Sequence, residues 1–176
     1  MAVQEKTAST TALMKMFLLA ALYLAVLCQA SSAWSAEAVH ADRLMYQVTV
    51  DGGIEATKQN LISALEGKNY TIINVLNVQE GLKGRGIEAH PIQLVEFCNL
   101  SKAYQVTRTA NEFEIFAPCR MALFEAGGKT TIKVLRPRHI RDSLPQDKLS
   151  PAGTAALDTF EQDIREVLET VASGGF

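Results

Sequence analysis

Apolar and polar residues alternate in several short segments of the chain, and this period of two predicts β-strands. Residues 44–50 (LMYQVTV) and 91–97 (PIQLVEF) show the alternation most plainly. Residues 70–78 (YTIINVLNV) are rich in β-branched side chains, which predicts a strand that is largely buried. Residues 119–137 predict a β-hairpin, because the glycine pair 127–128 interrupts two apolar alternating runs at a position suited to a tight turn.

Three other segments repeat apolar residues every three to four positions, which is typical of amphipathic helices. Residues 54–67 end in a glycine, a natural C-terminal stop. Residues 98–106 predict a short helix that Asn99 caps. The most regular pattern covers residues 151–172, where Ser150 precedes a proline that fits the first helical turn.

The remaining segments of the chain predict connections rather than helices or strands. Residues 79–91 contain three glycines and no helix follows them directly, so a flexible connection is favoured over a phosphate-binding loop. Residues 111–118 predict an extended stretch, and residues 137–148 a polar, basic loop. Within the middle helix, three residues are expected on the inner face: Leu100, Ala103 and Tyr104.

The order of elements is strand, helix, two strands, helix, two strands, helix. Five strands and three helices in this order predict a two-layer α+β fold. Its helices are expected to pack on one face of a largely antiparallel sheet. The predicted domain spans residues 44–172 as a single unit. Residues 34–43 are expected to form a short lead-in and residues 173–176 a frayed tail.

The N-terminal segment, residues 1–33, has the pattern of a secretory signal peptide. Lys15 precedes an apolar run of signal-peptide length, and small residues after it favour cleavage behind Ala33. The run is too short for a spanning helix, so no transmembrane span is expected after cleavage. These features predict a periplasmic or secreted protein. Cleavage would also remove Cys28 and leave two cysteines in an oxidising compartment.

The charge of the chain narrows the classes of partner. The formal net charge is −2, with 17 basic and 19 acidic residues. A nucleic-acid binder needs clustered Lys and Arg to contact phosphates, so the balance argues against nucleic acid as a partner.

Cys98 and Cys119 stand at the ends of predicted strands, and four interpretations of them are open. They can be small buried core residues, a disulfide if the two strands run antiparallel, ligands, or a nucleophile with a spare thiol. As ligands they would bind a metal or a non-covalent haem together with His90, Met121 or Met45. There is no Cys-x-x-Cys pair, so neither a zinc ribbon nor covalently attached haem is supported.

Two charged segments complete the set of candidates. A basic cluster predicts a small anion site or a partner-docking patch, with a solvated surface as the alternative. Its members are Lys133, Arg136, Arg138, His139 and Arg141. The acidic side chains of the last helix are expected to be solvated. They are Asp158, Glu161, Asp163, Glu166 and Glu169. No two carboxylates are placed for acid–base chemistry, so an enzyme is the less favoured class.

The run from VEFCNLSKAYQV through APCRMALFEAGGKTTIKVLRP to the closing helix resembles the domain-of-unknown-function 302 family over residues 44–172. In that family a cysteine–asparagine pair opens the middle helix and a proline–cysteine pair opens the following strand. The matching residues are Cys98, Asn99, Ala103, Pro118, Cys119, Glu125 and Pro137. The glycine-rich segment 79–91 and the export signal depart from the family pattern.

The resemblance implies a compact α+β fold, a homodimer and no assigned enzymatic activity. With the signal peptide, it favours an exported, non-catalytic binding or accessory module of the cell envelope, with an envelope protein as its partner and an unknown ligand. One alternative is a redox or electron-carrier protein that binds haem or a metal through Cys98, Cys119, His90 or Met121. A second alternative is a thiol-dependent enzyme.

Overall fold

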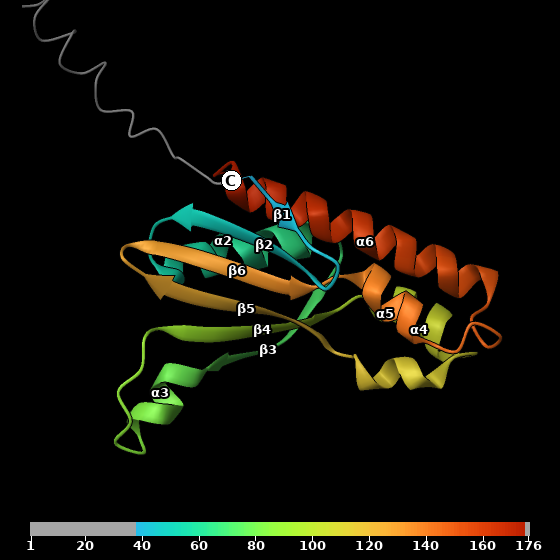
Figure 1. Ribbon diagram of the computed structural model, residues 1–176, viewed down its shortest axis with the longest axis horizontal. Coiled ribbons are helices and arrows are strands. Elements are labelled where there is room, and N and C mark those ends of the chain that lie inside the picture. The colour runs from blue at the N-terminus through green and yellow to red at the C-terminus, as the bar shows by residue number, and fades with distance from the viewer. Residues whose placement is uncertain (1–37, 175–176) are drawn as a thin grey trace, which may run out of the picture. The chain divides into compact units, whose positions relative to one another are not determined.

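The computed structural model describes residues 38–174, so the predicted signal peptide (1–33) lies outside the described part of the chain. Within residues 38–174, six strands form one sheet in the order β1-β2-β6-β5-β4-β3, and every neighbouring pair is antiparallel (Figure 1). The strands are β1 (His40–Ala41), β2 (Met45–Asp51), β3 (Thr71–Asn77), β4 (Ile92–Cys98), β5 (Cys119–Ala126) and β6 (Lys129–Leu135). The predicted α+β class and antiparallel sheet are confirmed.

Helices occupy the connections and the C-terminal end of the described chain. They are α2 (Ile54–Gly67), α3 (Val78–Lys83), α4 (Leu100–Thr107), the 3₁₀ helix η1 (Asn111–Ile115), α5 (Pro137–Ser143) and α6 (Pro151–Ala172). None of the helices in residues 38–174 is both long enough and apolar enough to cross a membrane. The predicted caps are present: the Asn99 side chain accepts from the backbone N–H of Lys102, and that of Ser150 accepts from Gly153.

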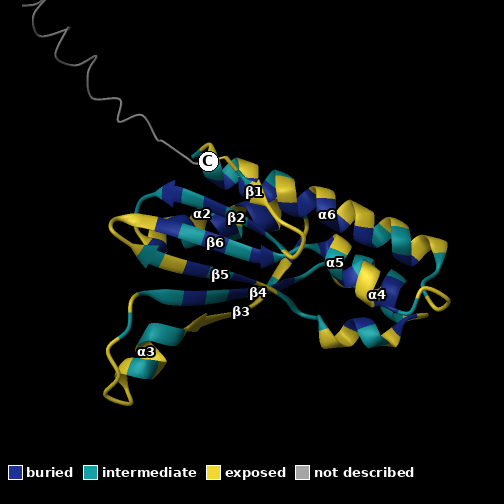
Figure 2. Ribbon diagram, viewed as in Figure 1, coloured by how far each residue is buried: buried dark blue, intermediate teal, exposed yellow. Residues whose placement is uncertain are grey.

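The hydrophobic core lies between the sheet and the two long helices, α2 and α6 (Figure 1). Each strand of the middle of the sheet places alternate apolar side chains toward these helices, as the period of two dictates. Figure 2 shows buried residues along the middle strands of the sheet and at intervals along α6. The largest fully buried side chains include Phe97, Met121, Leu123, Ile132, Leu61, Leu65, Leu157, Ile164 and Leu168.

Three predicted connections are helical in the structure, and in each case short-range hydrogen bonds explain the difference. Helix α3 begins where the Asn77 side chain accepts from the N–H of Glu80, inside the segment expected to be a flexible connection. Helix η1 replaces the extended stretch, because the N–H of Phe113 bonds to the carbonyl of Ala110. Helix α5 replaces much of the predicted basic loop and begins at Pro137.

The packing of α4 differs from the prediction. Leu100 and Tyr104 were expected on its inner face, but 67% and 63% of their surfaces are exposed. Val106 is the buried residue of the helix, and Ala103 packs partly against the core. Two turns of helix provide too few apolar positions for periodicity alone to indicate which side faces the core.

Strand β3 was expected to be largely buried and is instead an exposed edge strand (Figure 2). Its apolar side chains Ile73, Val75 and Leu76 are 38–49% exposed. The β-branched run predicts a strand correctly, but it does not indicate whether a helix covers that strand. At the opposite edge, the two-residue strand β1 was not predicted because it is too short to show alternation.

Candidate functional site

Cys98 and Cys119 lie side by side at one end of the sheet. Strands β4 and β5 run antiparallel, and Cys119 is paired with Phe97, the residue before Cys98. Both cysteines are free thiols in the structure. Together they border a cavity of about 30 Å³, which is space for one or two water molecules. We call it the thiol cavity; its other lining residues are Tyr70, Phe97, Asn99, Lys102, Ala103, Val106, Phe113, Ala117, Leu157 and Phe160.

Burial keeps both thiols protonated at neutral pH. Burial, together with the nearby Cys98, raises the pKa of Cys119 to about 12. Burial, assisted by the charge of Glu114, also raises the pKa of Cys98. A thiolate is the reactive form of cysteine in nucleophilic attack and in metal binding. The environment of the thiol cavity therefore disfavours the nucleophile interpretation.

The other residues predicted as ligands do not form a metal site with the two cysteines. His90 is exposed and precedes β4, whereas Cys98 ends that strand, roughly 20 Å away at the rise of a β-strand. Met121 is fully buried in the core, two residues along β5 from Cys119. Met45 begins β2 and pairs with Leu135. Within residues 38–174, no three His, Cys, Asp or Glu side chains are grouped to hold a metal ion.

The size of the thiol cavity bears on the haem interpretation. Sites for small molecules and cofactors usually measure roughly 300–1,000 Å³. The thiol cavity is about 30 Å³ and is walled by core side chains such as Phe97 and Phe160. A haem group therefore does not fit between the two cysteines in this arrangement of the core.

A polar network, which the sequence did not indicate, connects the thiol cavity to α6. The hydroxyl of Tyr70 donates to Asp163 Oδ2 at 2.9 Å, and Lys102 forms an ion pair with the same carboxylate. The Lys102 ammonium also lies 5.4 Å from the centre of the Tyr70 ring. Burial, followed by the negative charge of Asp163, raises the pKa of Tyr70, so its hydroxyl remains a donor.

The expectation that Glu161 and Asp163 are solvated is wrong, because each is only 8% exposed. Both lie within the apolar stripe of α6, close to Phe160 and Ile164. Their positions in that stripe were the available signal: a carboxylate at a core-facing position of an amphipathic helix needs a buried partner.

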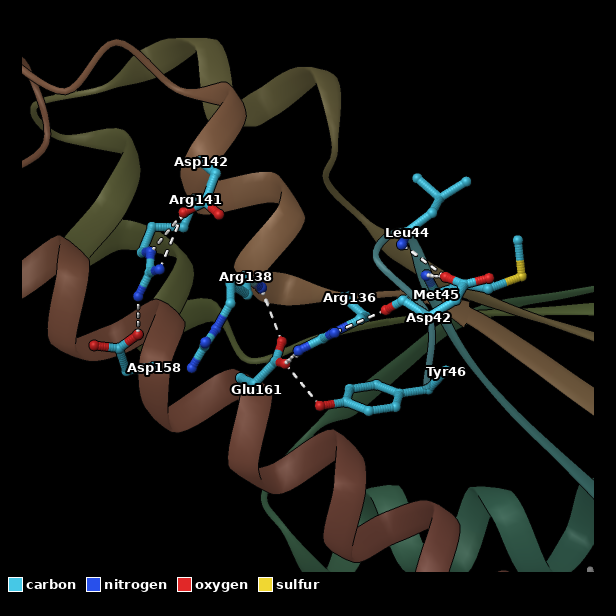
Figure 3. Close-up of polar contacts among 10 residues, drawn as sticks. All are labelled: Asp42, Leu44, Met45, Tyr46, Arg136, Arg138, Arg141, Asp142, Asp158 and Glu161. Carbon is cyan, nitrogen blue, oxygen red and sulfur yellow. Dashed lines mark hydrogen bonds and ion pairs between the residues drawn. The ribbon is translucent and has the colours of Figure 1, made fainter. Parts of the chain in front are cut away.

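Glu161 is the centre of a second network that involves the predicted basic cluster (Figure 3). Its carboxylate accepts from the hydroxyl of Tyr46 at 2.7 Å, from Arg136 Nη2 at 2.7 Å and from the backbone N–H of Arg138 at 2.8 Å. Burial alone would raise the pKa of Glu161, but these donors outweigh it and lower that pKa. The Arg136 guanidinium also lies 4.9 Å from the centre of the Tyr46 ring.

The predicted basic cluster is therefore not one patch. Arg136 is bound to Glu161, and Arg141 is bound to Asp142 and Asp158. Lys133 lies elsewhere, with its ammonium 5.9 Å from the centre of the Phe124 ring. Arg138 and His139 form no side-chain ion pair within residues 38–174. They line a separate hollow of about 370 Å³ with Arg43, Arg136, Asp142 and Ser143.

Cys119 also borders a second space, on the side away from the thiol cavity. This space is a hollow of about 280 Å³ between η1, the start of β5, the end of β6 and α5. We call it the apolar hollow; its lining residues are Ile115, Phe116, Cys119, Arg120, Val134, Leu135 and Ile140. Ile115 at its edge is 79% exposed. Sequence reasoning missed this hollow because η1 and α5 were not expected to be helices.

The sheet with its two covering helices and small cavity at one end defines an α+β domain without an evident catalytic centre in the described residues. The family model of the domain of unknown function DUF302 matches residues 46–171. The chain belongs to the DUF302 family. The residues that carried the resemblance have structural contacts as well: Glu125, for example, accepts from the first N–H of α2, that of Ile54, at 2.7 Å.

Two relatives place the chain among proteins of this kind. An uncharacterized protein from Aquifex aeolicus (strain VF5) is 29% identical over 138 residues, which are 77% of this chain and 88% of the relative. The crystal structure of an uncharacterized conserved DUF302 protein from Bacillus stearothermophilus superposes with a TM-score of 0.64 at 22% identity. The aligned region covers 73% of this chain and 98% of that chain. The likeness shows the shared fold.

Proposed function

We propose that this protein is a non-catalytic binding module of the cell envelope and that the apolar hollow holds its ligand. The volume of about 280 Å³ carries this proposal, because it approaches the lower size of small-molecule sites. Most of the lining side chains are apolar, and Arg120 supplies one cation. The ligand is a small apolar group, either of a free molecule or of a side chain from an envelope protein.

The chemistry of the sheet end supports binding rather than catalysis. The two thiols that border the hollow and the cavity are protonated, since burial raises the pKa of both. His90, the histidine proposed beside them, lies at the opposite end of β4. A thiol enzyme needs a base close to its nucleophile. Cys98 and Cys119 therefore act as small apolar wall residues of the thiol cavity, and Cys119 does so in the apolar hollow as well.

Indole is a suitable probe for the apolar hollow. The amide resonances of Phe116, Leu135 and Ile140 should shift in a saturable way when indole is added to the labelled protein. Leu135→Phe fills the hollow and should abolish these shifts. Ile73→Phe, an equally large change on the exposed strand β3, should leave them intact. Shifts that survive Leu135→Phe, or no saturable shifts in the native protein, would overturn the proposal.

The source of the apolar group can be distinguished by native mass spectrometry of the protein isolated from the envelope fraction. An extra mass that is lost on denaturation indicates a free small molecule. A discrete second polypeptide whose association Leu135→Phe removes indicates a protein side chain in the hollow.

Export is the second part of the proposal and rests on the signal-peptide pattern of residues 1–33. The intact mass of protein from the envelope fraction should correspond to a chain that begins at Trp34. A full-length mass, or protein that fractionates with the cytoplasm, would contradict export without affecting the hollow.

Strand β3 is the surface that best fits the expected homodimer. Edge strands are ordinarily protected by charged residues or proline, yet the seven residues of β3 (TIINVLN) include neither. In a two-fold pair the same strand comes from both copies, so each charge on it would bring a second like charge into the same contact. An uncharged edge with exposed apolar side chains is therefore compatible with a second copy of this chain.

A further inference from the structure

A hollow on the surface between the β1–β2 turn and α5 collects positive charge. It measures about 370 Å³, and three of its six lining residues are arginines: Arg43, Arg136 and Arg138. The other lining residues are His139, Asp142 and Ser143. This space is separate from the apolar hollow, which lies on the side of α5 that carries Ile140. We call it the arginine hollow.

Arg136 holds the two walls of the arginine hollow in place. Its Nη1 donates to the carbonyl of Asp42 at 2.7 Å, which fixes the β1–β2 turn. The Asp42 side chain in turn accepts from the N–H groups of Leu44 and Met45 at 2.7 and 2.6 Å, so the turn that carries Arg43 is closed on itself. Figure 3 shows Arg136 between this turn and Glu161.

The second wall is fixed by the same carboxylate. Glu161 accepts from the backbone N–H of Arg138 at 2.8 Å, and this bond anchors the first turn of α5. The Ser143 hydroxyl donates to the carbonyl of His139 at 2.7 Å within that helix. The backbone that carries Arg43, Arg138 and His139 is therefore set before any ligand arrives, which lowers the entropic cost of binding.

Two of the three arginines that line the hollow are not paired with a carboxylate of the described residues, although Arg138 also borders a neighbouring hollow with Asp158 and Glu161. Arg43 and Arg138 form no ion pair within residues 38–174, and the charge of Arg136 is satisfied by Glu161. The one carboxylate on the wall, Asp142, is bound by Arg141. Two guanidinium groups and an imidazole are thus available, in a protein whose net charge is −2. Guanidinium groups favour planar or tetrahedral oxyanions because they donate several parallel hydrogen bonds.

We infer that the arginine hollow binds an oxyanion, a carboxylate or phosphate group of a small molecule, through Arg43, Arg138 and His139. Arg136 is a positioning residue, since its own donors are already engaged by Glu161 and Asp42. This site lies beyond the proposed function, because it takes a ligand of opposite chemistry at a different place on the domain.

Titration of the ¹⁵N-labelled protein with inorganic phosphate and with succinate tests the inference, with sodium chloride at matched ionic strength as the reference. We expect saturable amide shifts confined to residues 42–44 and 137–143, with a Kd of about 1 mM or tighter for one of the two probes. The double variant Arg43→Gln/Arg138→Gln should weaken that binding at least about tenfold. Arg108→Gln/Arg85→Gln removes the same charge from exposed sites elsewhere and should leave the affinity within about twofold.

Each outcome bears on the inference. Saturation by phosphate alone assigns a phosphate-bearing ligand, and saturation by succinate alone assigns a carboxylate. Equal weakening by the two double variants would show a general charge effect and overturn the site. Shifts that chloride reproduces would overturn it as well. Because Arg43 and Arg138 are exposed, the variants should fold, and an unchanged amide spectrum outside the hollow verifies this.

Discussion

Arg136 donates two hydrogen bonds to Glu161, from Nε at 3.1 Å and from Nη2 at 2.7 Å, and both side chains are mostly buried. This pair links the end of β6 to α6, and Tyr46 adds a donor from β2. An ion pair in such a position is weak evidence for net stability, because desolvation opposes the attraction between the charges. Removing one partner is nevertheless costly, since the other is left buried without compensation.

Glu161→Gln should therefore lower the free energy of unfolding by about 2–4 kcal/mol at pH 7, as measured by chemical denaturation. Glu169→Gln is the matched control: its carboxylate is 55% exposed and lies 3.5 Å from Arg165, so its loss should change stability by less than about 0.5 kcal/mol. Equal effects of the two substitutions would show that the buried network adds nothing.

The difference in unfolding free energy between wild type and Glu161→Gln should depend on pH in a defined direction. The folded state lowers the pKa of Glu161 below its ordinary value of 4.5, so its contribution is complete above that pH. It should be lost as pH falls through the folded-state pKa. The stability difference between wild type and Glu161→Gln should thus shrink as the pH falls below 4.5. The other titrating carboxylates are common to both proteins, and a difference that stays constant over this range would contradict the assignment.

The two thiols should resist alkylation in the native protein. With a pKa of about 12, Cys119 exists as thiolate in only about 10⁻⁴ to 10⁻⁵ of molecules at pH 7.5. Iodoacetamide should modify it roughly a thousandfold more slowly than a free cysteine, and peptide mapping by mass reports the rate at each position. After denaturation without reductant, both Cys98 and Cys119 should be modified. Failure of both to react after denaturation would reveal a disulfide.

Gly153 of α6 lies against the backbone of α4. A Cβ at this position would meet Leu149 Cδ1 at 3.1 Å and the backbone carbonyl oxygen of Gln105 at 3.2 Å. Gly153→Ala should lower the free energy of unfolding by about 1–3 kcal/mol, because backbone atoms of α4 cannot yield easily. Gly67→Ala, which meets nothing within 4 Å, should be neutral or stabilise by up to about 1 kcal/mol. Thermal unfolding of the two variants compares them directly.

The proposed β3 contact predicts the effect of a single charge. Leu76→Lys would bring a lysine from each copy into the proposed contact in place of an apolar side chain, so it should convert the dimer to monomer or weaken it at least about tenfold. Leu100→Lys introduces the same charge on α4, where 67% of the side chain is already exposed, and should not change the mass of the particle. Sedimentation equilibrium gives both results. A wild-type monomer at high protein concentration would exclude the dimer.

Local sequence signals predicted much of this fold correctly. The hairpin turned by the glycine pair 127–128, the caps Asn99 and Ser150 and the long helix α6 each depend on residues close in sequence, and all are present. The site was harder to predict, because its partners come from distant segments. The position of Glu161 in the apolar stripe of α6 indicates burial, but its partners Arg136 and Tyr46 are brought to it only by the fold.

Distant contacts also explain why the predicted basic cluster does not form one patch in the structure. The closely spaced basic residues at 136–141 look like one patch in the sequence, but Arg136 and Arg141 each form an ion pair with a carboxylate of α6. Arg43, which shares a hollow with Arg138, is nearly a hundred positions away and gives no local signal. Cys98 and Cys119 lie together because β4 and β5 pair antiparallel. The order of strands in the sheet depends on distant contacts, so the local sequence does not show it.

The pairing of β2 with β6 has a consequence for how the chain reaches its native state. Tyr46 is paired with Val134, and its hydroxyl bonds to a residue 115 positions further along the chain. Contacts of such sequence separation form late, because a long loop must close first. Apart from the two-residue strand β1, the strand β2 therefore has no strand partner until β6, which ends at Leu135, has been synthesised. The sheet is therefore completed only when β6, the last strand in the sequence, inserts between β2 and β5.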